Sequence, residues 1–107
     1  MVRGARMQIQ IDHERVAGFC RRWKITELSL FGSVLRDDFR PDSDVDVLVV
    51  FAPETDWSFR DLARMEEELS EIFGRTVDLV EKKLVEQNRN YVVRKHILRS
   101  AEPVYVT

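Results

Sequence analysis

Three of the aspartates interrupt stretches that are otherwise apolar. Asp44 and Asp46 stand at the start of the valine-rich segment 45–51, and Asp78 divides the short apolar run 77–80. Alternate residues of a strand point to the same face, so Asp44 and Asp46 should project side by side. Carboxylates that close repel each other unless a proton or a cation neutralises them. Since Mg²⁺ takes carboxylate oxygens together with substrate phosphates, the pattern predicts a magnesium site.

Asp78 joins the same site if its segment pairs beside segment 45–51 in one sheet. Three carboxylates then suffice for two metal ions that share a bridging acid. Asp78 would serve either as a ligand of the second metal or as a general base, and the sequence leaves both roles open.

Gly32 and Ser33 follow the short apolar stretch 28–31 and precede a predicted helical turn over 34–36. Glycine lets the backbone turn tightly, and backbone amides at the start of a helix attract phosphate. The Ser33 hydroxyl adds a donor, and Arg36 is placed to neutralise a phosphate oxygen. The segment therefore predicts a phosphate-binding turn.

The two groups of residues together indicate nucleotidyl transfer. Metal bound by the acids would orient a triphosphate and lower the pKa of an acceptor hydroxyl, which attacks in line at the α-phosphorus while pyrophosphate leaves. A Gly-Ser pair or an Asp-x-Asp by itself is common in turns and loop edges. The prediction depends on their order, spacing and strand context.

The elements that must position these residues follow from hydrophobic periodicity and capping residues. We expect helices over 13–23, from Asp56 or Ser58 to Phe73, and within 84–99, and strands over 28–31, 45–51, 76–80 and, at an edge, 104–106. This order predicts an α+β fold, a two-layer α/β arrangement in which a small mixed sheet packs against helices, mainly on one face. Residues 1–10 are expected to be a flexible lead-in, and residues 11–107 a single domain.

Several other side chains with chemical potential are interpreted as structural. Cys20 and Met65 lie at core positions of their helices. For Trp57 and Phe59, core packing is favoured over stacking on a nucleobase. The run Glu66–Glu68 is interpreted as a solvated helix face rather than as a metal site.

Composition narrows the class of protein. The 107 residues carry a net charge of −2 and one cysteine, so we expect neither a strongly basic nucleic-acid-binding protein nor an internal disulfide. A reducing, cytoplasmic compartment fits. No apolar run approaches the ~20 residues of a membrane span.

The segments 30–36 and 40–46, with Gly32-Ser33, Arg36, Asp44 and Asp46, resemble the DNA polymerase β-like nucleotidyltransferase superfamily, whose third acid lies on a later strand, as Asp78 does. More narrowly, the chain is similar to the minimal nucleotidyltransferases (MNT), the MntA-type antitoxins. The similarity covers nearly all of the chain beyond residue 10.

That resemblance implies an antitoxin whose partner is a HEPN-domain ribonuclease toxin. Characterised family members transfer AMP from ATP to a tyrosine of the toxin, which implies ATP as substrate and Mg²⁺, as two ions, as cofactor. The family motif carries over onto Gly32, Ser33, Asp44, Asp46 and Asp78.

Departures from the family pattern leave alternatives open. Asp37 stands where many members have glycine, and Val34 where a larger residue is frequent. One alternative is a module that neutralises its toxin by stoichiometric binding without catalysis. Another is nucleotidyl transfer to RNA or a small molecule, with a separate subunit for recognition. A homodimer and a hetero-oligomer with the toxin are both compatible with the sequence, and direct binding of nucleic acid or membrane is not expected.

Overall fold

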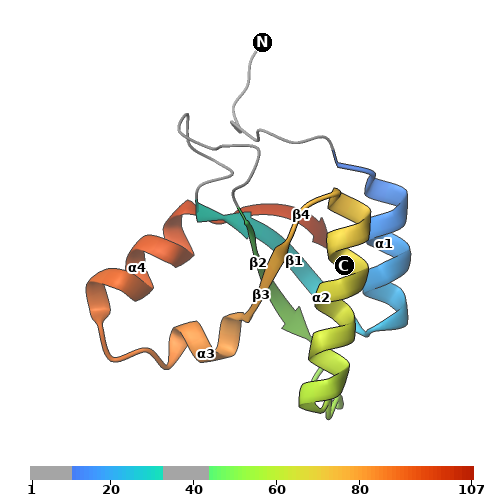
Figure 1. The fold of residues 1–107 in the computed structure, drawn as a ribbon. Helices are drawn as coiled ribbons and strands as arrows, with labels where there is room; N and C mark the ends of the chain where they lie inside the picture. Colours follow the sequence, from blue (N-terminus) through green and yellow to red (C-terminus); the bar gives the residue numbers. More distant parts are fainter. Residues whose placement is uncertain (1–10, 33–43) are drawn as a thin grey trace.

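The computed structural model describes residues 11–32 and 44–107. In chain order the described elements are α1 (His13–Arg22), β1 (Ile25–Phe31), β2 (Val45–Phe51), α2 (Phe59–Phe73), β3 (Val77–Glu81), α3 (Lys82–Glu86), α4 (Tyr91–Ser100) and β4 (Glu102–Val106). The strands form one sheet in the order β3-β2-β1-β4 (Figure 1). None of the described helices is long and apolar enough to cross a bilayer.

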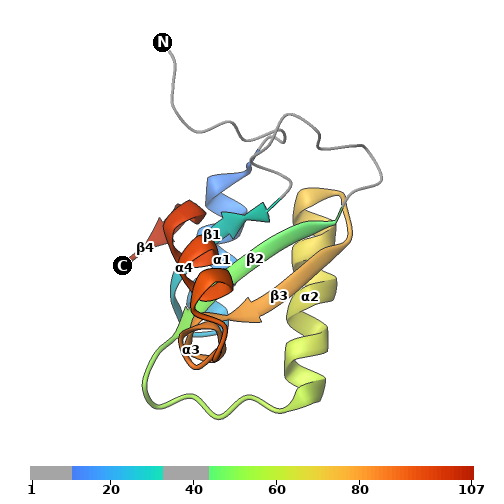
Figure 2. The ribbon, with the colours of Figure 1, turned by 90° about the vertical axis from the view of Figure 1, so that its left-hand side faces the viewer.

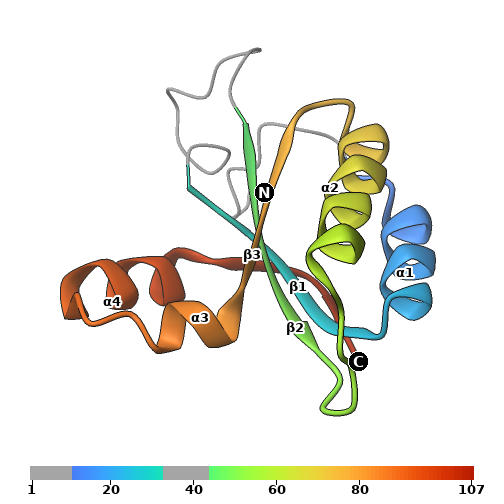
Figure 3. The ribbon, with the colours of Figure 1, turned by 60° about the horizontal axis from the view of Figure 1, so that its bottom comes forward.

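The sheet is mixed, as the sequence predicts. β2 pairs parallel with β3, whereas β1 is antiparallel to both β2 and β4. Helices α1 and α2 cover one face of the sheet, and α3 and α4 lie on its other side (Figure 3). The helical cover is therefore less one-sided than we expected.

The core lies between the sheet and helices α1 and α2. Val45, Val47 and Val49 alternate along β2 and are buried against side chains of both helices, including Phe19 and Met65. This alternation is the period of a strand, so the same pattern sends the intervening side chains, Asp46 among them, to the opposite face. The burial of Met65 confirms its predicted core position.

Cys20 is also a core residue, as predicted. Its side chain is fully buried, and this burial raises the pKa of the thiol to about 12, with a smaller opposing effect of Arg21. A thiol that stays protonated is a poor nucleophile and metal ligand, so Cys20 acts in packing.

Capping residues fix where the helices begin and end. The Asp12 carboxylate accepts a hydrogen bond from the Arg15 amide at the start of α1. Ser58 and Asp61 form a reciprocal capping box at the start of α2, which decides between the two predicted caps in favour of Ser58. Gly74 ends α2 in the left-handed conformation, φ +70°.

Three boundaries differ from the expectation. β1 begins at Ile25 rather than at residue 28, so the strand is seven residues long. The last predicted helix is two helices, α3 and α4, because Asn90 caps a new helix by accepting a hydrogen bond from the Val93 amide. The expected edge strand at 104–106 is confirmed and begins earlier, at Glu102.

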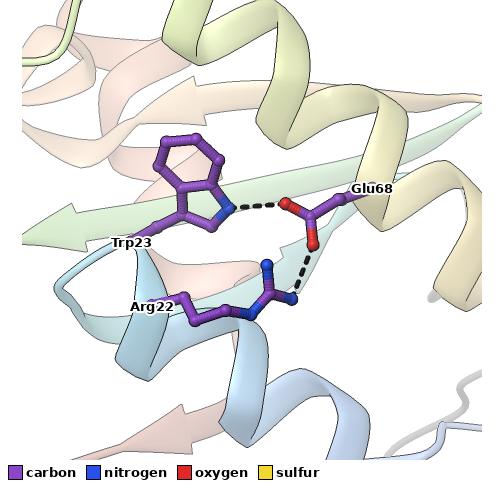
Figure 4. Close-up of polar contacts among 3 residues, drawn as sticks. All are labelled: Arg22, Trp23 and Glu68. Atoms are coloured by element: carbon purple, nitrogen blue, oxygen red, sulfur yellow. Dashed lines mark hydrogen bonds and ion pairs between the residues drawn. The ribbon is translucent and has the colours of Figure 1, made fainter.

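Two side-chain predictions on α2 were wrong. Phe59, for which core packing is favoured from the sequence, is 92% exposed at the first position of the helix. The run Glu66–Glu68 is not simply solvated, because Glu68 binds two groups of the α1 end. Its carboxylate accepts a hydrogen bond of 2.7 Å from the Trp23 indole and forms an ion pair of 2.6 Å with Arg22 (Figure 4).

Trp57 completes this junction. Its indole donates to the Trp23 carbonyl at 3.1 Å, and the two rings meet edge to face with centroids 5.1 Å apart. Trp57 is therefore a packing residue, which confirms the interpretation favoured from the sequence. The junction joins the end of α1, the segment before α2 and α2 itself.

The Glu68 contacts predict a pH dependence of stability. Hydrogen bonding from Arg22, and then from Trp23, holds the pKa of Glu68 below its usual value despite partial burial. A depressed folded-state pKa stabilises the fold above the unfolded-state pKa, and this contribution is lost as the pH falls through the folded-state value. Denaturant unfolding should therefore show wild type more stable than Glu68→Gln at pH 7 and the two converging toward pH 3. The exposed neighbour supplies the control Glu67→Gln, and an unchanged gap at pH 3 would contradict the assignment.

Candidate active site

Gly32 and Asp46 lie in direct contact at one end of the sheet. A β-carbon built on Gly32 would overlap the Asp46 carboxylate oxygen Oδ2 and would stand 3.2 Å from its Cγ. Gly32 also has φ +81°, a conformation that side chains disfavour. Position 32 therefore favours glycine, because a side chain would be strained at this φ and would push the Asp46 carboxylate from its place.

The antiparallel pairing of β1 with β2 produces this contact. The two strands run in opposite directions, so the end of β1 meets the start of β2, and Phe31 pairs with Asp46. Gly32 follows at once and turns the chain beside that carboxylate. Gly32 and Asp46, which are far apart in the sequence, thus come together at one end of the sheet.

Asp78 lies opposite Asp46 on the neighbouring strand. In the parallel pairing of β2 with β3, Asp46 is the register partner of Asp78. Register partners in adjacent strands share a face, and adjacent strands lie about 4.8 Å apart. The predicted neighbourhood of the Asp78 segment is therefore confirmed, and both acids stand on the face opposite the α1–α2 core.

Asp44 is exposed and lies one residue before β2, two residues ahead of Asp46. Ser33 and Arg36, the predicted phosphate-binding residues, lie outside the described residues, as do Val34 and Asp37. The arrangement of Gly32, Asp46 and Asp78 thus comes from the structure, whereas the contribution of Ser33 and Arg36 stays a prediction.

The donor set fits magnesium rather than a softer metal. Asp44, Asp46 and Asp78 offer only carboxylate oxygens, the ligands that Mg²⁺ prefers. Within residues 11–32 and 44–107, no three His, Cys, Asp or Glu side chains form a ready-made metal cage. Mg²⁺ is usually held by one or two carboxylates together with substrate phosphates and waters, so a site that substrate completes is the arrangement these residues suit.

A wide hollow of about 970 Å³ lies elsewhere, along α2, with Glu67, Glu71 and Arg22 in its lining. None of the three aspartates lines it. We place the candidate site at the aspartates because their chemistry and the Gly32 contact, rather than the size of a depression, identify it.

Comparisons with known proteins show the family of the chain. Residues 14–101 match the nucleotidyltransferase domain family, a range that contains every predicted site residue. The chain belongs to this nucleotidyltransferase family.

Relatives and solved structures narrow the similarity. The nucleotidyltransferase is 38% identical to the protein adenylyltransferase MntA of Thermococcus cleftensis over 85 residues, which cover 79% of this chain and 78% of the relative. It is 33% identical, with a TM-score of 0.65, to a structure assigned as a minimal nucleotidyltransferase, over 85% of this chain and 87% of the other. A toxin–antitoxin structure with AMP-PNP shares the fold at 17% identity, with a TM-score of 0.67 over 91% of this chain and 75% of that one.

Sequence reasoning missed two residues beside the site. Glu66 and Ser70 of α2 bind backbone amides on both sides of Asp78. Their spacing of four residues, adjacent to the buried stripe that includes Met65 and Leu69, is the available signal. A run of glutamates is equally typical of a solvated helix face. The sequence alone therefore did not predict the hydrogen bonds of Glu66 and Ser70.

The Gly32 contact predicts a large effect of a single methyl group. Gly32→Ala should lower nucleotidyl transfer by about 100-fold or more, because moving an aligned reacting group by about 1 Å costs that much. Because alanine is strained at the positive φ of position 32, the substitution should also lower the free energy of unfolding by about 1–3 kcal/mol. Steady-state kinetics and denaturant unfolding measure the two effects.

Gly18→Ala is the matched control, because a β-carbon on Gly18 meets no atom within 4 Å and the residue lies inside α1. That variant should keep full activity and gain about 0.5–1 kcal/mol of stability. Full activity in Gly32→Ala would contradict the prediction, because it would show that the position of the Asp46 carboxylate against residue 32 does not affect transfer.

Proposed function

We propose that this nucleotidyltransferase transfers AMP from ATP to a protein acceptor, a tyrosine of a cognate HEPN-domain toxin, in a Mg²⁺-dependent reaction. The observation that carries the proposal is the Asp46 carboxylate lying against Gly32 and opposite Asp78. The relative MntA is named a protein adenylyltransferase. A fold neighbour, with a TM-score of 0.59, is an MNT antitoxin in complex with a tri-AMPylated HEPN toxin of Shewanella oneidensis.

In this proposal each residue has a defined task. Asp44, Asp46 and Asp78 hold Mg²⁺, as two ions, and Gly32 with Ser33 and Arg36 binds the triphosphate of ATP. Bound Mg²⁺ supplies neutralising charge to the phosphates and acidity to the acceptor hydroxyl. A bond forms between the tyrosine oxygen and the α-phosphorus, and the bond from that phosphorus to the bridging oxygen breaks, which releases pyrophosphate. Asp78 is placed either to accept the phenol proton or to serve as a ligand.

The surface of α4 supports a protein as acceptor. Tyr91 and Val92 are 58% and 73% exposed, and with Lys95 and Arg99 they line a hollow of about 540 Å³. Exposed apolar side chains gathered on one face are typical of protein interaction sites. The helix leads directly into β4, whose first residue pairs with Leu30 of β1, two residues before Gly32. A protein bound along α4 would thus lie close to the candidate site.

The exposed surface of α4 is also compatible with the alternative of a non-catalytic binding module. Such a module needs a surface that binds its toxin but needs no metal. A cytoplasmic location, predicted from the single cysteine, and a homodimer stay proposals. Transfer to RNA or to a small molecule has no feature of the described residues in its favour.

Labelling with radioactive ATP tests the proposal. Incubation of the chain with Mg²⁺, α-labelled ATP and its cognate HEPN-domain toxin should label the toxin. Asp44→Asn with Asp46→Asn should reduce the labelling rate by about 1,000-fold, since several kcal/mol of charge stabilisation are lost with the metal.

The control removes two carboxylates from the exposed segment before α2, with Glu54→Gln and Asp56→Asn, and should label at the wild-type rate. If the Asp44 and Asp46 variant blocks toxicity in cells as well as wild type does, the binding-module alternative is correct. Labelled RNA in place of labelled protein would move the acceptor to nucleic acid.

A further inference from the structure

Asp78 stands on an edge strand. Among the strands of residues 11–32 and 44–107, β3 pairs only with β2, and the Val45 amide donates to the Thr76 carbonyl across that pair at 2.9 Å. Successive residues of a strand direct their backbone groups to opposite sides, so Val77 and Leu79 turn their amides away from β2. An edge strand in that position has unpaired donors and little to hold its register.

Two side chains of α2 take the place of the missing strand. The Ser70 hydroxyl accepts a hydrogen bond of 3.1 Å from the Val77 amide, and the Glu66 carboxylate accepts one of 2.9 Å from the Leu79 amide. Figure 2 shows α2 running alongside the β3 edge of the sheet. Since α2 and β3 run in opposite directions, the i and i+4 positions of the helix reach alternate residues of the strand.

The two amides flank Asp78, the residue that pairs in register with Asp46. We infer that Glu66 and Ser70 are positioning residues, which hold the Asp78 carboxylate opposite Asp46 for metal binding and transfer. This inference deepens the proposed function and rests on it. Glu66 contributes through a charge-assisted hydrogen bond, the stronger of the two types, so its removal should matter more than that of Ser70.

The neighbouring glutamates supply a matched set of variants. Glu66→Ala removes the acceptor, Glu66→Gln keeps an amide oxygen at the same place, and Glu67→Ala removes an exposed carboxylate from the next position of α2. Ser70→Ala tests the second hydrogen bond. All four variants keep the buried stripe of the helix intact, because Met65, Leu69 and Phe73 form it.

Amide hydrogen exchange by NMR is the first readout, and it needs neither metal nor acceptor. Glu66→Ala should speed exchange at Leu79 by about tenfold, the factor that corresponds to loss of one hydrogen bond to a charged acceptor. Glu66→Gln should restore most of the protection, and Glu67→Ala should match wild type. Unchanged exchange at Leu79 in Glu66→Ala would overturn the inference.

Kinetics with the HEPN-domain acceptor is the second readout. Glu66→Ala should lower kcat and raise the Mg²⁺ concentration for half-maximal rate, each by about tenfold, while KM for the acceptor stays unchanged, because the variant displaces a metal ligand and not the binding surface. Glu66→Gln should rescue both parameters. Faster exchange at Leu79 with unchanged kcat and Mg²⁺ dependence would reduce Glu66 to support of the fold and overturn its positioning role.

Failure of the proposed function and failure of the positioning role of Glu66 give different results. If wild type labels no acceptor, the proposed function fails, and a Mg²⁺ titration with AMP-PNP, followed by the chemical shift of the Asp78 amide, still decides the inference. A tenfold weaker midpoint in Glu66→Ala supports the positioning role, and an equal midpoint overturns it.

Discussion

The contact between the Gly32 backbone and the Asp46 carboxylate is the constraint on which the rest of the site depends. A side chain at position 32 would occupy the space of the carboxylate, and the positive φ at that glycine makes the turn that leaves β1. One small residue thus lets the end of β1 lie directly beside the Asp46 carboxylate. Both strand pairs are needed for this arrangement. The antiparallel β1–β2 pair brings Gly32 to Asp46, and the parallel β2–β3 pair brings Asp78 to it.

The face that carries Asp46 and Asp78 is supported from the opposite side of the sheet. Helices α1 and α2 bury the inward valines of β2, which fixes the outward direction of Asp46 between them. The same helix α2 stabilises the edge strand of Asp78 with Glu66 and Ser70. Packing and hydrogen bonds to α2 therefore hold the two strands that carry Asp46 and Asp78 side by side.

Several strand and helix boundaries could be predicted from the sequence, because they depend on residues close together in the chain. The β-branched run predicted the strand over 45–51, which is β2, and capping chemistry narrowed the start of α2 to Asp56 or Ser58. Features set by tertiary contacts were not predictable: Glu66 and Glu68 resemble a solvated run until β3 and the end of α1 lie beside them. Phe59 satisfies the helical period, yet it is the first residue of α2 and is exposed.

Paramagnetic relaxation tests the central claim most directly. Mn²⁺ substitutes for Mg²⁺ and broadens the NMR signals of nearby amides, so a titration of the chain with Mn²⁺ and AMP-PNP locates the cation. The account predicts that the amides of Gly32, Asp46 and Asp78 lose intensity together at the lowest Mn²⁺ concentrations, while those of Glu67 and Tyr91 persist. Broadening that begins instead along the acidic face of α2, around Glu67 and Glu71, would contradict it.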